Sequence, residues 1–388
     1  MSDIGSVTTT GAVWGLCRPL PPAGPLPSRA EVVIVGGGVT GVAVLGALRA
    51  RGVDAILVER DRLAAGASGR NAGFLLAGVA ENYARAVVRY GRSTAVQVWR
   101  FSLENHALIT ALASRLDAGH RVHGSLTVAL DAAESASLEE AATLLAEDGL
   151  PGSLTRHQEL AGSMGELFNP ADGEIDPVRL VAGLAAAHAG RIHENCRVVA
   201  VKDGSRGAVA ELGDASVEAS AVVLATNAWT AELLPSAPIT AVRAQMLATA
   251  PAPPCVSRPV YADWGHRYWR QREDGTVLVG GFRHRALRDE VGFDVTPTPV
   301  VQAHLEEQLR ALVGGARVTH RWAGTMGFSA DGLPLVGLVD GSRHVHVCAG
   351  YTGHGMGLAV NAAAVLVRRM LDGEPLPPWL DAARRPQA

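Results

Sequence analysis

Four residues near the start of the chain have the types and spacing needed to hold a phosphate-linked ligand. Gly36, Gly38 and Gly41 follow the G-x-G-x-x-G pattern directly after the apolar run EVVIV, and Glu59 ends the next apolar run. In this pattern the first glycine allows a tight turn, the second admits a pyrophosphate, and the third lets a helix pack against the strand. The helix N-terminus offers N–H groups to phosphate, and the acidic side chain accepts hydrogen bonds from a ribose. The spacing predicts a dinucleotide site rather than a bare glycine-rich turn.

A second group of residues has the chemistry of a substrate pocket. Aromatic side chains are scarce in the chain as a whole, yet Tyr261, Trp264, Tyr268, Trp269 and Phe282 crowd together. Alternation along a strand places Tyr268 and Arg270 on one face and Trp269 on the other. An apolar wall with a few polar groups is typical of a ligand site, although a packed sheet face has the same composition.

The elements that position these residues follow from hydrophobic periodicity. EVVIV and DAILVE are predicted strands joined by the helix VTGVAVLGALRA, which forms a strand-helix-strand unit. Further helices are predicted at about 93–115, 135–148, 178–189 and 298–313, and a long one begins at HGMG. Short strands are predicted around 125–130, 196–229, 239–282 and 344–350, and the Pro-rich stretch CRPLPPAGPLPSRA is predicted to be an extended arm.

Composition limits the function classes. The chain has 388 residues, of which 48% are hydrophobic and 19% charged, with a net charge of −3. We expect two domains, no dominant nucleic-acid surface and no membrane span, and a cytoplasmic protein because no signal peptide is recognisable. The four cysteines are too far apart for a metal knuckle, and the His120/His123 and His344/His346 pairs lack further ligands, so no metal site is expected.

Five segments together resemble the D-amino-acid-oxidase-like superfamily of FAD-dependent oxidoreductases, which includes glycine, sarcosine and amine oxidases. They are VIVGGGVTG (33–41), LVERDRLAAGASGRNAG (57–73), VVLATNAW (222–229), RWAGTMGFSADGLPLVG (321–337) and AGYTGHGMGLA (349–359). Within the superfamily, the chain most resembles enzymes of the gamma-glutamylputrescine oxidase type.

The resemblance implies a mixed fold, α/β plus α+β. It comprises a Rossmann-like FAD-binding domain of the glutathione-reductase type and a discontinuous substrate domain with an antiparallel sheet. After an N-terminal arm (1–28), residues 29–80, 176–232 and 320–388 are expected to form the FAD-binding domain. Residues 81–175 and 233–319 are expected to form the substrate domain.

The resemblance also implies which residues hold FAD. The three glycines would face the pyrophosphate, Glu59 and Arg60 the adenosine side, Val199 the adenine, and Asn227 the crossing of the chain near the cofactor. A loop would run toward the isoalloxazine, and the last helix would begin beneath it. Gly324 lies where some members carry a cysteine bonded to the flavin, so we expect non-covalent FAD. The loop residues are Ser68, Gly69, Arg70, Asn71 and Gly73, and those of the last helix are Gly353, His354, Gly355, Met356 and Gly357.

The expected substrate is a small-molecule amine. Amino-acid oxidases of the superfamily carry an arginine for the substrate carboxylate where this chain has Met326, and methionine cannot form that bidentate pair. Arg270, Arg283 or Arg285 remains open as an alternative clamp. Tyr268, Trp322 and Tyr351 are predicted to line the pocket, and His354 and Tyr268 are the candidate catalytic residues.

The expected reaction is FAD-dependent oxidation of a C–N bond. Hydride passes to flavin N5, an imine forms, and oxygen reoxidises the flavin to give hydrogen peroxide. Lys202, the only lysine, is a poor candidate for oxygen activation, so His354, His266 or an arginine would replace it electrostatically. The alternatives are an amino-acid oxidase or dehydrogenase and a dehydrogenase with another electron acceptor. Less favoured are a flavin monooxygenase, a flavin module acting on tRNA, and a NAD dehydrogenase. The oligomeric state stays open.

Overall fold

The first sheet is built around β1 (Arg29–Val35), whose last four residues are buried. This strand pairs in parallel with a strand on each side. The computed structural model describes residues 11–156, 158 and 160–384. The strand order is β10-β11-β12-β1-β2-β9, and β19 pairs in parallel with β12 and antiparallel with β18. The strands are β2 (Ala55–Val58), β9 (Ile192–His193), β10 (Ala200–Asp203), β11 (Ala208–Leu212), β12 (Ala215–Leu224), β18 (Leu335–Leu338) and β19 (Val345–Ala349).

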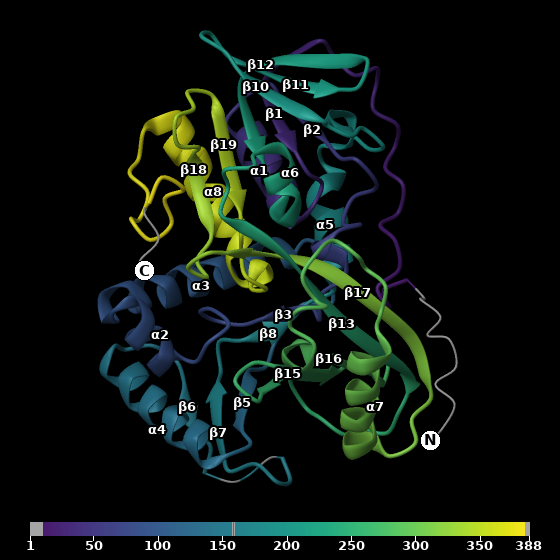
Figure 1. The fold of residues 1–388 in the computed structure, drawn as a ribbon, viewed down its shortest axis with the longest axis vertical. Helices are drawn as coiled ribbons and strands as arrows, with labels where there is room; N and C mark the ends of the chain where they lie inside the picture. Colours follow the sequence, from purple (N-terminus) through teal and green to yellow (C-terminus); the bar gives the residue numbers. More distant parts are fainter. Residues whose placement is uncertain (1–10, 157, 159, 385–388) are drawn as a thin grey trace.

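Helices cover this sheet in the upper half of Figure 1. Helix α1 (Val39–Ala50) follows β1 directly and packs against α8 (Gly355–Asp372) and α5 (Pro177–Ala186). The predicted strand-helix-strand unit is therefore confirmed, and the parallel strands with covering helices form the predicted Rossmann-like α/β arrangement. The short α6 (Thr230–Leu233) follows β12, and the 3₁₀ turns are η1 (Ala67–Gly69), η2 (Ala189–Arg191), η3 (Asn227–Trp229) and η4 (Arg283–Arg285).

The second large sheet lies below the first in Figure 1 and is antiparallel apart from one parallel pair. Its order is β17-β13-β16-β15-β14-β5-β7-β6, with β14 and β5 the parallel pair. The strands are β5 (Ser125–Ala129), β6 (Ser153–Leu154), β7 (Gly165–Asn169), β13 (Ile239–Pro251), β14 (Val260–Ala262), β15 (Arg267–Gln271), β16 (Thr276–Gly281) and β17 (Val318–Ser329). Since β17 pairs with β13 along its length, residues 320–329, which begin the segment 320–388 predicted for the FAD-binding domain, lie in this second sheet.

Helices α4 (Ala132–Glu147) and α7 (Pro299–Val313) pack against the second sheet, α2 (Tyr83–Tyr90) packs against α3 (Arg92–Ala113) and α4, and α3 packs against α8. Helices α3, α4 and α7 match the predicted helices, whereas α2 was not predicted. Gly91 has a φ of 78° and separates α2 from α3. The segment before the predicted helix at 93–115 is therefore a second helix and not a loop. A small third sheet, β3 (Phe74–Leu75), β8 (Gly173–Glu174) and β4 (Arg121–Val122), lies between the two layers.

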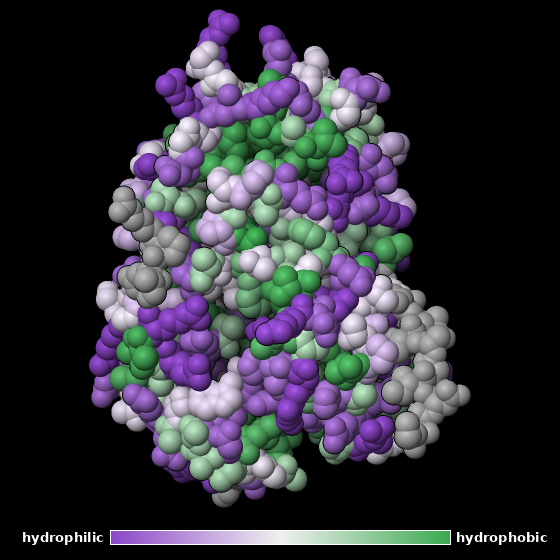
Figure 2. Space-filling model, viewed as in Figure 1, coloured by the Kyte–Doolittle hydropathy of each residue, from purple (hydrophilic) through white to green (hydrophobic). Residues whose placement is uncertain are grey.

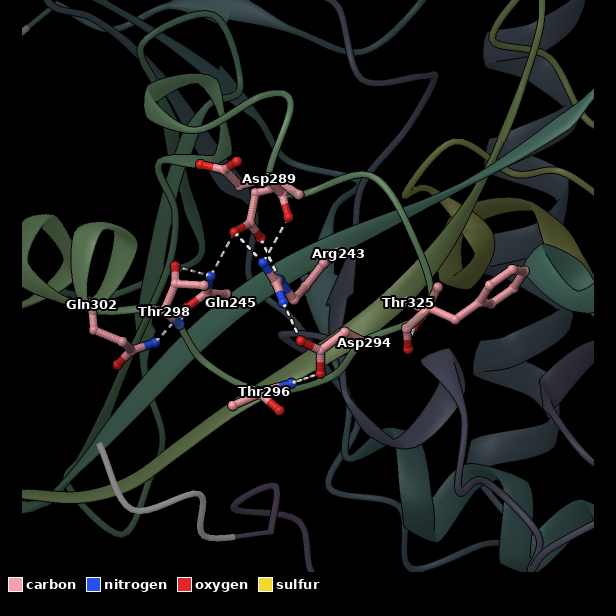
Figure 3. Close-up of polar contacts among 10 residues, drawn as sticks. Arg243, Gln245, Asp289, Asp294, Thr296, Thr298, Gln302 and Thr325 are labelled. Atoms are coloured by element: carbon pink, nitrogen blue, oxygen red, sulfur yellow. Dashed lines mark hydrogen bonds and ion pairs between the residues drawn. The ribbon is translucent and has the colours of Figure 1, made fainter. Parts of the chain in front are cut away.

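A buried ion-pair network fastens the segment after β16 to β13 (Figure 3). Arg243 is 5% exposed and donates through Nε and Nη2 to the two carboxylate oxygens of Glu290, which is 1% exposed, both at 3.0 Å. Its Nη1 donates to Asp294 at 3.1 Å, and Gln245 donates to Glu290 at 2.8 Å. The network holds the loop that begins at η4.

The described part of the N-terminal arm lies against the layer between the sheets. The Trp14 indole N–H donates to the Asn71 carbonyl at 2.8 Å, and the Arg270 and Arg272 guanidinium groups lie 5.2 and 5.1 Å from the centre of the Trp14 ring. Residues 1–10 of the predicted arm lie outside the described residues. The arm is therefore a packed element of the fold and not a loose linker.

Hydrophobic side chains reach the surface in small patches between hydrophilic ones on the face shown in Figure 2. Among the helices formed by the described residues, none has the length and apolar character needed to span a membrane.

Candidate active site

The main cavity begins where β1 ends and α1 begins. Gly36, Gly37 and Gly38 line it, and Gly36 has a φ of 112°, which disfavours any side chain. A Cβ on Gly36 would lie 2.7 Å from the Ala225 carbonyl oxygen, and one on Gly41 would lie 1.9 Å from the Gly36 carbonyl oxygen. The first glycine thus permits the turn and Gly41 permits close helix packing, as the pattern predicts.

The amide groups at this turn are held by two side chains. The Glu59 carboxylate accepts from the amide N–H of Gly37 at 2.6 Å and from that of Asp61 at 2.9 Å, and burial raises its pKa. The Ser68 hydroxyl accepts from the Val39 amide at 2.9 Å. The N-cap residue of α1, Gly38, has no side chain to cap the helix, and the first turn has no acidic residue, so the N–H groups other than that of Val39 and the positive end of the helix favour an anion.

A glycine-rich loop forms one wall of the cavity. The Asn71 side chain ties the loop together by donating to the carbonyls of Ala67 and Ser68 and accepting from the Gly73 amide. The Arg70 guanidinium donates to the carbonyls of Ala65 and Ala323, each at 2.9 Å, and burial lowers its pKa. Arg70 therefore links this loop to β17 and keeps a positive charge in the cavity wall.

The N-terminus of α8 forms another wall. His354 precedes the helix, which has no side-chain cap and no acidic residue in its first turn. The Asn105 side chain, fully buried on α3, donates to the Met356 carbonyl and accepts from the amides of Val360 and Asn361. These contacts fix the direction of the first turn, whose free N–H groups can stabilise negative charge in the cavity.

Aromatic rings close the end of the cavity toward the second sheet. Tyr261 and Tyr268 stack with centroids 5.6 Å apart, and Phe74 meets the edge of Tyr268 at 6.1 Å. The Arg283 guanidinium lies 4.9 Å from the centre of the Phe328 ring. Burial raises the pKa of Tyr268 to about 12 and lowers that of His354 to about 4, so both side chains are neutral at pH 7.

Most predicted site residues lie around this one cavity. The residues that line it are Gly36, Gly38, Glu59, Arg60, Ser68, Arg70, Asn71, Asn227, Tyr268, Arg283, Gly324, Met326, Tyr351, Gly353, His354, Gly355, Met356 and Gly357. Gly69 and Gly73 lie behind its wall, where a Cβ on either would come within 2.2 Å of a carbonyl oxygen, of Ala64 and Ile175 respectively. Their roles toward a ligand remain predictions.

Three predicted residues lie elsewhere. Val199 is exposed, and its neighbour Val198 lines the cavity instead. Trp322 is fully buried below the loop and donates to the Arg70 carbonyl, so it supports the wall without lining it. Arg270 is 3% exposed, donates to the Gly73 carbonyl at 2.9 Å and is covered by Trp14, so it is not available to a substrate.

Other residues line the cavity without having been assigned there. Tyr261 and Phe328 do so at the aromatic end, and Cys196, Arg197 and Trp229 do so at the nucleotide end. The clustering of aromatic residues included both Tyr261 and Tyr268 but did not show that the two rings stack on each other. Trp229 follows Asn227 by two residues, and the Arg60 guanidinium lies 4.2 Å from the centre of its ring. No local sequence pattern predicts this contact, because the two residues are far apart in the chain.

The residues considered as the positive charge for oxygen activation differ in position and in charge. Lys202 lies on β10, where it is exposed and forms an ion pair with Glu211. Burial lowers the pKa of His266 as well as that of His354, so a protonated histidine is wrong for this site near pH 7. Arg283 and Arg70 are the arginines left in the wall near the aromatic end. Within the residues that the structure describes, no group of three potential ligands could hold a metal ion.

The fold and the cavity define a dinucleotide-dependent oxidoreductase, with a glycine turn at a helix N-terminus and a pocket against a second sheet. The uncapped helix N-termini, the glycine turn and the Glu59 carboxylate fit FAD. The chain belongs to the DAO family of FAD-dependent oxidoreductases, whose family model matches residues 31–369.

Individual relatives agree with this family. The chain is 26% identical to gamma-glutamylputrescine oxidoreductase of Escherichia coli over 89% of this chain and 84% of that protein. It is 30% identical to the tRNA 5-methylaminomethyl-2-thiouridine biosynthesis bifunctional protein MnmC of Burkholderia mallei, covering 94% of this chain but 60% of that protein. Glycine oxidase from Geobacillus kaustophilus has a similar fold, with a TM-score of 0.78, 24% identity and coverage of 92% and 98%.

Proposed function

We propose that the protein oxidises the C–N bond of a small-molecule amine with FAD bound non-covalently in the main cavity. The observation that carries the proposal is the aromatic end, where the uncharged side chains of Tyr261, Tyr268, Met326 and His354 surround one space continuous with the glycine turn. FAD, when bound, supplies the hydride acceptor for the C–H next to the nitrogen. The protein's own residues must bind, orient and desolvate the amine.

The charges around this end favour a neutral amine. The carboxylates that line the main cavity, Glu59, Asp61 and Glu232, belong to the nucleotide end. At the aromatic end, the charged side chains of the lining are Arg70 and Arg283. Burial and nearby positive charge both disfavour an ammonium ion, so the pKa of a bound amine falls. A neutral nitrogen has the lone pair that stabilises the developing iminium, so His354 and Tyr268 need act only by shape and hydrogen bonding.

Met326 supports an amine without an α-carboxylate. Its side chain lines the cavity, and its sulfur would lie 3.3 Å from a Cβ on Gly353, so it fills the place next to the α8 turn. The test is anaerobic reduction of the bound flavin by matched pairs that differ only by an α-carboxylate, benzylamine against phenylglycine and ethylamine against alanine. Faster reduction by the amines supports the proposal, whereas faster reduction by the amino acids favours the alternative, an amino-acid oxidase or dehydrogenase.

Attachment and reoxidation need separate tests. Of the four cysteines, Cys196 alone lines the cavity, and it lies at the nucleotide end. Acid precipitation is expected to release yellow flavin into the supernatant. We propose oxygen as the acceptor, with Arg283 or Arg70 supplying the positive charge. Hydrogen peroxide equal to the amine consumed supports an oxidase, whereas turnover with an artificial dye alone indicates a dehydrogenase.

A modified tRNA base is a second candidate substrate, favoured by the similarity to MnmC. The net charge of −3 argues against it, because non-specific RNA affinity depends on basic surface. Salt-dependent binding of tRNA by the purified protein would favour this candidate, and its absence would favour a free amine.

A further inference from the structure

A second cavity, the side chamber, opens from the aromatic end of the main cavity. It has a volume of about 550 Å³ and lies between α2, α4, the strands β5 and β7, and the β14–β15 turn. Tyr261, His266, Arg283, Phe328 and His354 line both spaces. Since ligand pockets commonly have volumes of about 300–1,000 Å³, the chamber is large enough for a substantial part of a substrate.

The carboxylates of the side chamber already have donors. Asp172 accepts from the Ala77 amide and the Ser125 hydroxyl, at 2.9 and 2.6 Å. Glu134 accepts from the amides of Trp264 and Leu130, and Glu81 forms an ion pair with Arg89 at 3.0 Å. None of these groups is left free to receive a cationic substrate.

Arg283, unlike these carboxylates, has no hydrogen-bonding partner among the described residues. Among the described residues, no carboxylate, carbonyl or hydroxyl oxygen accepts a hydrogen bond from its guanidinium, which lies over the Phe328 ring and near Tyr268 and Tyr261. It is half-buried, and of the charged side chains it alone lines both spaces. A guanidinium carries five N–H donors, and those of Arg283 face the two cavities without an acceptor in the described part of the chain, so a ligand that enters can accept hydrogen bonds from them.

The backbone holds Arg283 in this place at a cost. The preceding residue, Phe282, has a φ of 60°, a left-handed conformation that is rare for a bulky side chain. The following loop is fastened through Glu290 to Arg243 on β13. A second arginine, Arg85, lies at the exposed edge of the chamber over the Trp264 ring at 4.8 Å, also without a carboxylate partner among the described residues. The free charges of the chamber are thus positive.

We propose that the side chamber binds the far end of the substrate, and that this end carries a carboxylate held by Arg283. The substrate class is then an amine whose anionic group is separated from the reacting carbon by a chain, and not an α-amino acid. A guanidinium pairs with a carboxylate through two parallel hydrogen bonds, so Arg283 determines both affinity and the depth to which the amine enters. The inference rests on the proposed function for the amine end alone.

The first test compares ligands on the holoenzyme. Glycine, β-alanine, γ-aminobutyrate, δ-aminovalerate and ε-aminocaproate are compared with alkylamines of matching length in anaerobic flavin reduction. We expect the longer amino carboxylates to exceed both glycine and the matched alkylamines in kcat/KM. Glycine as the best of the series, or alkylamines equal to the amino carboxylates, would overturn the proposal.

The second test does not depend on oxidation. Glutarate and adipate, which have no amine, are titrated into the holoenzyme by calorimetry. Arg283→Gln is expected to weaken their binding by about 10- to 100-fold, since a hydrogen bond to a charged group is lost, whereas Arg283→Lys retains part of it. Arg285→Gln is the matched control, because Arg285 is exposed on the same turn and lines neither cavity.

The outcomes separate the two proposals. Equal binding by the wild type and Arg283→Gln, or no binding of either dicarboxylate, would refute the role of Arg283. If no amine or amino acid reduces the flavin while dicarboxylates bind through Arg283, the proposed oxidation fails and the assignment of the chamber stands. Arg283→Gln should also unfold close to the wild type, because the guanidinium has no hydrogen-bonding partner to lose among the described residues and gives up only the contact with the Phe328 ring.

Discussion

Replacing Arg243 by methionine is expected to destabilise the protein strongly. The change removes four hydrogen bonds, of which two end on Glu290 and one each on Asp294 and the Asp289 carbonyl. Glu290 is 1% exposed and would retain only the donor from Gln245, so its charge would lie buried without a counter-ion. Loss of one partner of a buried ion pair costs about 3–5 kcal/mol, and we expect a value in this range.

The double variant Arg243→Met/Glu290→Leu is the decisive control. It removes both buried charges, and Asp294 has a side chain that is 67% exposed and is solvated without Arg243. Gln245 still donates to Thr298 at 2.7 Å. Replacing a whole buried pair by apolar groups is often nearly neutral, so the double variant should cost about 1 kcal/mol or less.

The assay is equilibrium unfolding in urea, followed by tryptophan fluorescence and by far-ultraviolet circular dichroism. Coincident transitions give the free energy of unfolding for each variant. A cost below about 1 kcal/mol for Arg243→Met would contradict the reasoning, because it would mean that Glu290 finds solvent or protonates at little expense. A double variant as unstable as the single one would show that packing, and not the uncompensated charge, dominates.

Three further predictions follow from positions described above. Gly36→Ala places a methyl group 2.7 Å from the Ala225 carbonyl and should abolish bound flavin absorbance, whereas Gly52→Ala, with a similar positive φ but open space around it, should retain flavin at a modest loss of stability. Asp172→Asn should become more stable relative to the wild type as pH rises. Burial raises the pKa of Asp172 from 3.8 to about 7, so the stability that its protonated carboxyl contributes is present at low pH and is lost as pH rises through 7. Urea unfolding of both proteins from pH 4 to 8 measures this difference. Trp14→Ala should free the arm and cost about 3–5 kcal/mol, seen as faster limited proteolysis before residue 29 and faster flavin release.

Each of these has a result that would count against it. Flavin retained by Gly36→Ala would mean that the turn can shift, and an unchanged pH profile for Asp172→Asn would mean that its carboxyl is not the group that titrates. His106, with its ring 4.0 Å from Asp172, has a pKa lowered to about 4, so its pH dependence has the opposite sign and stays in both proteins. Protection of the arm in Trp14→Ala would show that the proline-rich stretch docks by itself.

Local patterns predicted what depends on local chemistry. The glycine turn, Glu59 and the helix at His354 lie where spacing put them, because turn geometry and helix ends are set by neighbours in sequence. Period-two alternation placed Tyr268 and Arg270 on one face, and both do share it. What it could not show was that Trp14, more than two hundred residues earlier, covers Arg270.

The predictions for Val199 and Trp322 failed because they depend on contacts between residues distant in sequence. Val198 and Val199 are adjacent and equally apolar, so only the pairing of β10 with β11 decides which one faces the cavity. Trp322 and Met326 have the same parity on β17, yet the loop at Arg70 covers one end of that face and leaves the other open. The side chamber depends on α2, which the sequence did not reveal, so the chamber itself had no signal in the sequence.

The order of strands in the first sheet has a consequence for how the chain acquires its structure during synthesis. β1 pairs with β12, but β19 and α8 follow more than one hundred residues after β12, and α8 is the helix that packs against α1. Until α8 leaves the ribosome, the face of α1 that packs against it remains open to solvent and to other chains. Pairing over such sequence separation is slow, and exposed apolar surface in the meantime promotes aggregation. Folding of the protein should therefore respond to chaperones and to lower growth temperature, and flavin can be enclosed only after α8 has been synthesised.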